Sequence, residues 1–196
     1  MDTGLLFAAI LGYALGSIPF GLLLTRMAGL GDIRKVGSGN IGATNVLRTG
    51  NKGVAAATLV ADAGKAAVAV LIARYLWGES AALIAGFAAF IGHLYPIWLR
   101  FKGGKGVATM IGALLALSWL VGLIFCAVWA FVAYTRRYSS LAALTAAATS
   151  PIFAFQISGM NLAATTAALA LLLFYRHREN ISRLLKGEEP KIGAGK

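Results

Sequence analysis

Long apolar stretches separated by short polar connectors dominate the chain and predict membrane-spanning helices. A helix rises about 1.5 Å per residue, so about 20 residues cross a hydrocarbon core about 30 Å thick. The apolar stretches are residues 4–24, 54–76, 81–99, 107–134, 141–157 and 161–175. Five of these six fit one crossing each, whereas 107–134 is too long for a single crossing.

Positive charge indicates how the long stretch is divided, because short cytoplasmic loops carry an excess of Lys and Arg. The connectors 25–53 and 100–106 are basic, whereas 77–80 carries only Glu79. Placing both basic connectors in the cytoplasm puts the N-terminus outside. Dividing the long stretch near Ser118 then puts the basic C-terminal tail in the cytoplasm as well. As a helix, its first half would be about 17 Å long, which indicates a short, tilted or half-crossing element.

The chain is therefore predicted to be an all-α polytopic integral membrane protein with seven transmembrane helices, N-terminus outside and C-terminus cytoplasmic. Composition agrees: 59% of the residues are hydrophobic and 13% are charged, whereas a soluble surface needs about 25–35% charged residues. The one cysteine, Cys126, lies in an apolar stretch, which excludes a disulfide scaffold. We find no repeat or soluble domain, so residues 1–196 are expected to form a single membrane-embedded domain. Abundant Ala and Gly predict closely packed helices.

The first polar segment, 37–48, combines glycines with hydrogen-bond donors. Its glycines permit close approach of a ligand to the backbone, and successive N–H groups can form an anion nest. A flexible polar loop would explain the same composition. The candidate ligand-binding residues are Gly37, Ser38, Gly39, Asn40, Gly42, Thr44, Asn45 and Arg48.

The second polar segment, 101–109, places glycines and lysines directly before an apolar helix. Both the free N–H groups and the dipole of a helix N-terminus favour an anion such as phosphate. Lysines that contact lipid headgroups are the alternative. The candidates are Lys102, Gly103, Gly104, Lys105, Gly106 and Thr109. His93, which ends the preceding apolar stretch, is either a packing residue or a ligand.

The third polar segment, 175–188, is expected to continue a helix. Residues three or four apart share a helix face, which would present His177 and Asn180 together. A solvated, charge-paired helix end explains Arg176, Glu179 and Arg183 equally well.

Asp62 and Lys65 lie well inside an apolar stretch, three residues apart. Ionisable groups at membrane depth are costly and are usually paired or functional. A structural ion pair is the favoured interpretation, and a Lys65 that reaches toward the cytoplasmic segments is the alternative.

Together these segments resemble the motifs of the bacterial acyl-phosphate:glycerol-3-phosphate acyltransferases, the PlsY family. The resemblance covers essentially the whole chain and rests on Gly-Ser-Gly-Asn-x-Gly-Ala-Thr-Asn at 37–45, Gly-His-x-Tyr-Pro at 92–96, Lys-Gly-Gly-Lys-Gly-Val-Ala-Thr at 102–109 and Tyr-Arg-His-Arg-Glu-Asn-Ile at 175–181. It implies an inner-membrane enzyme that transfers a fatty acyl group from acyl phosphate, not from acyl-coenzyme A, to the 1-hydroxyl of glycerol 3-phosphate. The product would be lysophosphatidic acid, which enters phospholipid biosynthesis.

This reaction requires two phosphorylated substrates to be held side by side, and the polar segments supply cations and donors for them. The expected catalytic residues are Ser38, Arg48, Lys105, His177 and Asn180. The residues expected to bind substrate phosphate are Gly37, Gly39, Asn40, Gly42, Thr44, Asn45, Gly103, Gly104 and Gly106, and the secondary candidates are Lys65, His93, Lys102 and Thr109. Oriented donors would also stabilise the oxyanion that develops at the acyl carbon. The base is the open point, since the His-x4-Asp pair of the coenzyme-A-dependent glycerolipid acyltransferases is absent: Trp98 and Ser182 stand five residues after the two histidines. A substrate phosphate oxygen is the expected proton acceptor, with His177 and Asn180 orienting glycerol 3-phosphate.

Two other classes of function fit parts of the pattern. A transporter or flippase for an anionic phosphorylated solute would also combine basic loops with buried Asp62 and Lys65, although the outer half of the chain has few polar residues. A lipid-binding scaffold would need the cationic loops but not the order of the glycines. The expected partners are the two small-molecule substrates and membrane lipid, without nucleic acid or an obligate protein partner. Two distant histidines and scattered acids predict no metal or other cofactor.

Overall fold

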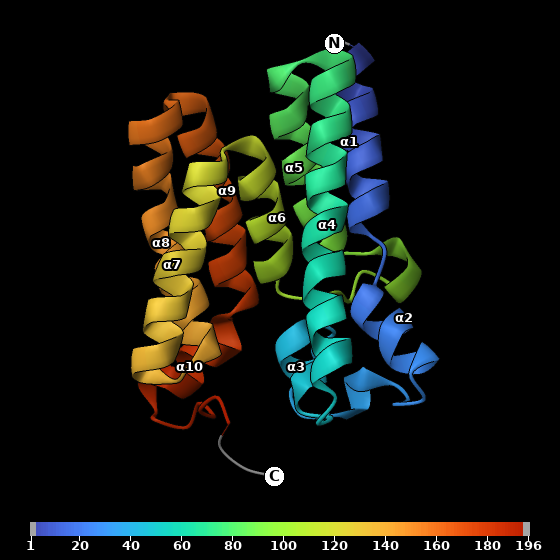
Figure 1. Cartoon of the computed structure of the whole chain (residues 1–196), viewed down its shortest axis with the longest axis vertical. Coiled ribbons are helices and arrows are strands. Elements are labelled where there is room, and N and C mark those ends of the chain that lie inside the picture. Colours follow the sequence, from blue (N-terminus) through green and yellow to red (C-terminus); the bar gives the residue numbers. More distant parts are fainter. Residues whose placement is uncertain (1–2, 194–196) are drawn as a thin grey trace. The chain divides into compact units, whose positions relative to one another are not determined.

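The computed structural model describes residues 3–193, and these form helices without a strand. The ends of the chain, residues 1–2 and 194–196, lie outside the described residues. The helices are α1 Thr3–Gly16, α2 Phe20–Met27, η1 Ile33–Lys35, α3 Ala43–Leu47, α4 Lys52–Trp77, α5 Glu79–Leu94, η2 Ile97–Leu99, α6 Val107–Leu117, α7 Trp119–Arg136, α8 Ser139–Ser158, α9 Met160–Arg176 and α10 Arg178–Leu185 (Figure 1). The predicted all-α class is confirmed for the described part of the chain.

Five segments of the described chain are long and apolar enough to cross a membrane. They are Thr3–Met27, Lys52–Trp77, Glu79–Leu99, Trp119–Arg136 and Ser139–Ser158. The helices α6 and α9 are apolar but shorter, so the count of seven crossings stays a prediction. The predicted division near Ser118 is present, because Ser118 has the extended angles φ −152° and ψ 100° between α6 and α7.

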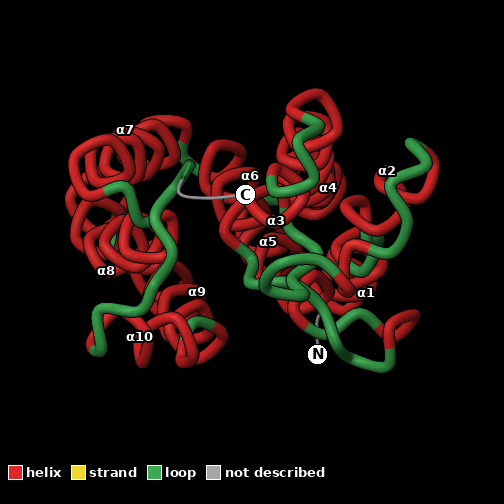
Figure 2. The backbone as a smooth tube through the Cα atoms, turned by 90° about the horizontal axis from the view of Figure 1, so that it is seen from below, coloured by secondary structure: helices red, strands yellow, loops and turns green. Residues whose placement is uncertain are grey.

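The chain folds into two compact units, Met1–Leu117 and Ser118–Lys196. In the first unit α1, α4, α5 and α6 pack together. The connector 95–106 lies beside the start of α6, partway along α4, and the connector 28–51 lies at the end of the unit where α4 begins (Figure 1). Figure 2 views that end, with its loops in green. In the second unit α8 packs against both α7 and α9, and α10 follows α9. The single domain over 1–196 stays a prediction.

Small residues bring the helices of the first unit close together, as the sequence predicts. A Cβ atom added to Gly12 or Gly16 of α1 would overlap the backbone of Ala85 or Ala89 in α5. Around this contact lies a buried core of alanines, which includes Ala66, Ala69, Ala73 and Ala113. Close backbone approach of this kind is how membrane helices gain packing energy.

A break in the first span was not predicted. Pro19, which has no N–H group to donate, lies between α1 and α2, where the sequence pattern predicted one continuous helix over 4–24. The break leaves the carbonyl of Ile18 able to accept a hydrogen bond from the Lys65 ammonium at 2.8 Å.

The last carbonyls of α6 are bound by Arg74 of α4. Its Nη1 donates to the Ala116 oxygen at 2.6 Å, its Nη2 to the Leu117 oxygen at 3.1 Å, and its Nε to Glu79 at 2.7 Å. The final carbonyls of a helix have no donor within the helix. Arg74 therefore allows α6 to end at Leu117 after only 11 residues.

Candidate functional site

The buried side chain of Asn45 organises the first polar segment. Its Nδ2 lies within 3.1 Å of the carbonyl oxygens of Ile33, Val36 and Asn40. Its Oδ1 accepts hydrogen bonds from the N–H of Ser38 at 3.1 Å and from the Ser38 hydroxyl at 3.3 Å. Since Asn45 is only 2% exposed, its amide shapes the loop that carries the other candidates.

Ser38 and Arg48 flank the turn at Gly37. Gly37 has φ +55°, a value that favours glycine. A Cβ atom there would lie 2.7 Å from Cδ and 2.8 Å from Nη1 of Arg48, so the arginine side chain lies over the glycine backbone. Both Ser38 and Arg48 are exposed. The loop thus presents a hydroxyl and a guanidinium close together; Gly39, Asn40, Gly42 and Thr44 complete it.

The glycines of the second polar segment pack on the end of α5. The N–H of Gly103 donates to the Leu94 oxygen and that of Gly104 to the His93 oxygen, each at 3.1 Å. A Cβ atom on Gly104 would overlap Nε2 of His93, and one on Gly106 would overlap the Phe90 ring. Close packing therefore explains these glycines, and it fixes the backbone around Lys105.

The N-terminus of α6 follows this packed segment. Its first N–H groups have no acceptor within the helix, and the helix dipole favours an anion there. Thr109, in the first turn, is fully buried, and among the described residues its hydroxyl has no hydrogen-bond partner. A buried hydroxyl without a partner costs free energy, so Thr109 remains a candidate to contact a ligand. Lys102 precedes the glycines and is exposed.

Lys65 connects the interior of the first unit to this segment. Its ammonium donates to Asp62 Oδ1 at 2.7 Å and lies 2.9 Å from His93 Nδ1. The predicted ion pair with Asp62 is therefore present, and Lys65 also reaches the histidine on which Gly104 packs. Asp62, Lys65 and His93 are 1%, 5% and 4% exposed.

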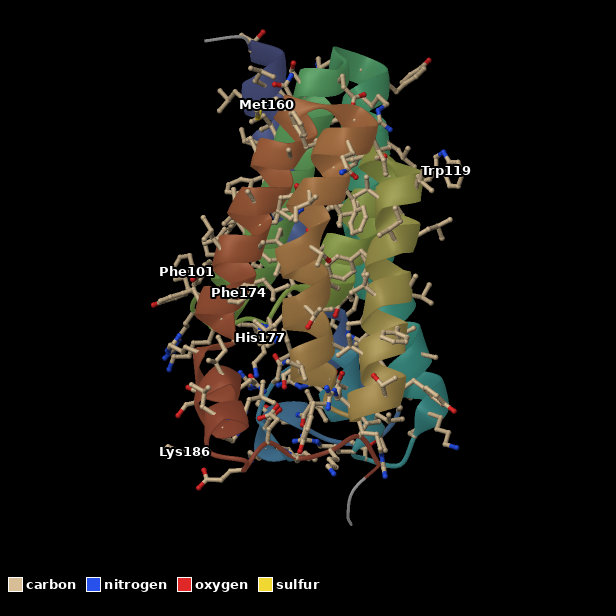
Figure 3. The ribbon with its side chains drawn as sticks, turned by 90° about the vertical axis from the view of Figure 1, so that its left-hand side faces the viewer. Phe101, Trp119, Met160, Phe174, His177 and Lys186 are labelled. Carbon is tan, nitrogen blue, oxygen red and sulfur yellow. The ribbon has the colours of Figure 1, made fainter. Side chains whose placement is uncertain are left out.

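The third polar segment places His177 between α9 and α10 (Figure 3). The ring is buried, and its Nδ1 lies 2.8 Å from the Leu173 carbonyl oxygen. Because a carbonyl oxygen can only accept, Nδ1 carries a proton, and in the neutral form of the ring Nε2 is then an acceptor. The segment belongs to the second compact unit.

Glu189, the residue directly after this segment, also organises it and was not among the predicted site residues. Its carboxylate accepts hydrogen bonds from Asn180 and Ser140 at 2.6 Å each, and from Arg183 at 2.7 Å. Burial raises the pKa of Glu189, but these three hydrogen bonds outweigh it, so the net pKa lies below its usual value. The adjacent Glu188 is exposed, and nothing in the sequence distinguishes the two acids.

The connector that leads into the second polar segment packs against the connector that carries the first. Leu99 of η2 packs against a cluster that includes Ile33, Ile41 and Val46 from the first connector. Among residues 3–193, no three His, Cys, Asp or Glu side chains are placed to hold a metal ion together.

Comparisons with known proteins match nearly the whole chain. The family model for glycerol-3-phosphate acyltransferase matches residues 6–187. Curated glycerol-3-phosphate acyltransferases include one from Jannaschia sp., 63% identical over 94% of this chain and 91% of the relative, and one from Mesorhizobium japonicum, 60% identical over 99% of both chains.

Solved structures of PlsY, an integral membrane glycerol 3-phosphate acyltransferase, have the same fold. The glycerol 3-phosphate form has a TM-score of 0.91 and 40% identity, with 96% of both chains covered. The lysophosphatidic acid form has a TM-score of 0.89 and 38% identity, covering 96% of this chain and 95% of that one. This chain belongs to the PlsY family of integral membrane glycerol-3-phosphate acyltransferases.

Proposed function

We propose that this protein transfers a fatty acyl group from acyl phosphate to the 1-hydroxyl of glycerol 3-phosphate. The ester bond forms as the acyl–phosphate bond breaks, and the products are lysophosphatidic acid and inorganic phosphate. The family match over residues 6–187 carries the proposal, because it spans the first two polar segments and the third as far as Gly187. The product would enter phospholipid biosynthesis.

Charge compensation and positioning supply most of the proposed catalysis. The exposed Ser38 and Arg48 would bind one phosphate, and Lys105 with the start of α6 would bind another. Holding two reactants in a reactive geometry removes a large entropic part of the barrier, and acyl phosphate already carries a good leaving group. The hydroxyl proton would pass to a phosphate oxygen of the substrate.

His177 and Asn180 would orient glycerol 3-phosphate. The Nε2 acceptor of a neutral His177 suits a contact with a substrate hydroxyl, and Asn180 is fixed by Glu189. A general-base role for His177 predicts that His177→Gln loses turnover with little change in the KM for glycerol 3-phosphate. The orienting role predicts mainly a raised KM.

We place the reaction at the cytoplasmic face of the bacterial inner membrane, in a single domain of seven crossings. The basic connectors and tail favour this orientation. The acyl chain has a candidate site in an apolar hollow of about 410 Å³ in the first unit, lined by Ala9, Ile10, Tyr13, Ala14, Ile97 and Trp98. Its η2 residues lie next to the connector that carries Lys102 and Lys105.

The test uses the purified full-length protein in detergent. Phosphate release from acyl phosphate should depend on glycerol 3-phosphate and should match the lysophosphatidic acid detected by mass spectrometry. Acyl-coenzyme A of the same chain length serves as the control donor and should give no product. A protein that transports glycerol 3-phosphate into vesicles without forming product would contradict the proposal.

A further inference from the structure

Lys65 is the centre of a buried polar cluster that the proposed chemistry does not use. Its ammonium has three hydrogens, and three acceptors surround it: Asp62 Oδ1, the Ile18 carbonyl and His93 Nδ1, at 2.7, 2.8 and 2.9 Å. The cluster unites α4, α5 and the break between α1 and α2.

These contacts indicate which ring nitrogen of His93 carries the proton. A charged Lys65 ammonium can only donate, so Nδ1 at 2.9 Å from it is an acceptor and the proton of the neutral ring lies on Nε2. Asp62 Oδ1 lies 3.7 Å from the same Nδ1, beyond hydrogen-bond distance. The Nε2 edge is the part of the ring on which Gly104 packs, so closely that a methyl group on Gly104 would overlap it. The backbone of Gly103 and Gly104 is also bonded to the Leu94 and His93 carbonyls. The orientation of one ring therefore determines where the segment before α6 lies.

Stability alone is a weak explanation for the cluster. Removing two charges from water is costly, and replacing a buried ion pair by apolar side chains is often neutral or stabilising. The surrounding core consists of alanines that already pack closely. Because burying the ion pair costs free energy that an apolar pair would not, we expect a second role, and the contact with His93 supplies one.

We propose that Lys65, held by Asp62, is a positioning residue of the acyltransferase. Through His93 it holds Gly103–Gly106, and with them Lys105, in the geometry that binds a substrate phosphate. The side chain of Lys65 acts through His93 and does not itself touch substrate. The inference rests on the proposed function, and its tests include a binding measurement that needs no acyl donor.

The first experiment separates positioning from folding. Lys65→Met alone should lower the unfolding temperature, because it leaves the Asp62 carboxylate buried without its partner. The double variant Asp62→Asn with Lys65→Met should recover that temperature. Its KM, and its Kd for glycerol 3-phosphate measured by calorimetry, should still rise by about tenfold or more. A double variant with wild-type stability, KM and Kd would overturn the proposal.

The second experiment tests the route through Gly104. Gly104→Ala should also raise the KM by about tenfold, whereas the matched control Gly64→Ala, which meets no atom within 4 Å, should not. Combining Gly104→Ala with the Asp62 and Lys65 changes should add little further loss, because all act on one contact. A multiplicative loss would contradict the proposed route.

Failure of the two proposals can be told apart. A wild-type protein that binds glycerol 3-phosphate but releases no phosphate from acyl phosphate would refute the proposed donor, and the Kd comparison would still test Lys65. An active wild type with an unaffected double variant would refute only the role of Lys65. A wild type that neither binds nor reacts would count against both.

Discussion

At the scale of single residues, the buried amide of Asn45 is the least replaceable group of the first polar segment. One side chain holds the carbonyls of Ile33, Val36 and Asn40 and the backbone of Ser38. A residue expected to contact phosphate thus has a clear role in shaping the loop.

Asn45→Ala should destabilise the protein and reduce its activity. Removal of the amide leaves buried backbone groups without partners, at a cost of about 1–3 kcal/mol. Thermal unfolding and turnover of the purified variant would measure both effects. The exposed Asn161, changed to Ala, is the control and should change neither. Unchanged unfolding of Asn45→Ala would mean that the loop holds its shape without this side chain.

Arg48→Lys tests whether the guanidinium itself is required. Lysine keeps the charge but lacks the planar fork that binds phosphate with two hydrogen bonds. We expect kcat/KM to fall by about tenfold or more, while Lys35→Ala, an exposed cation of the same connector, stays near the wild type. Equal activity of Arg48→Lys and the wild type would show that charge alone suffices.

At the scale of elements, the contact between α8, α10 and the tail depends on Glu189. Its carboxylate accepts hydrogen bonds from Ser140 of α8 and from Asn180 and Arg183 of α10. Asn180 is a predicted site residue. The contact with Glu189 therefore both stabilises the second unit and holds Asn180 in place for its proposed role.

Lowering the pH should weaken the contact that Glu189 makes between α8, α10 and the tail. The folded pKa of Glu189 lies below its ordinary value of 4.5, so the contact stabilises the fold above that pH and is lost as the pH falls through the folded pKa. Glu189→Gln should therefore flatten the pH dependence of the unfolding temperature below pH 4.5, relative to the exposed Glu188→Gln control. Identical acid profiles for the two variants would contradict this assignment.

Helix boundaries show what the sequence can and cannot reveal at this scale. The division near Ser118 was predictable because the charges on either side of the long apolar stretch required it. The break at Pro19 was missed because the prediction followed hydropathy over 4–24 as a whole. Gly16, Ser17 and Pro19 are the local signal that could have located it. Asp62 and Lys65 were recognisable as a pair, but their contact with His93 depends on how α4 and α5 pack.

At the scale of the whole molecule, the topology can be tested directly. In a Cys126→Ala background, Ser80→Cys should react with a membrane-impermeant maleimide in intact spheroplasts. Lys186→Cys should react only after the membrane is permeabilised, because positive charge favours the cytoplasm for this segment. Labelling of Lys186→Cys in intact spheroplasts would reverse the proposed orientation.

The class of the molecule and its three polar segments were predictable because apolar runs and glycine-rich motifs are local features of the chain. Which acid organises the third segment was not predictable, since Glu188 and Glu189 are neighbours of the same type. The packing of Gly104 on His93 also depends on a contact between segments that hydropathy does not encode.

The shortness of α6, held at its far end by Arg74, affects how a lipid-borne reactant arrives. With about 17 Å of helix in a core of about 30 Å, Lys105 is expected to lie below the membrane surface. An acyl donor could then diffuse sideways within its own leaflet and dock without lifting its tail into water. Encounter would become a two-dimensional search, and its rate would follow the density of donor in the bilayer.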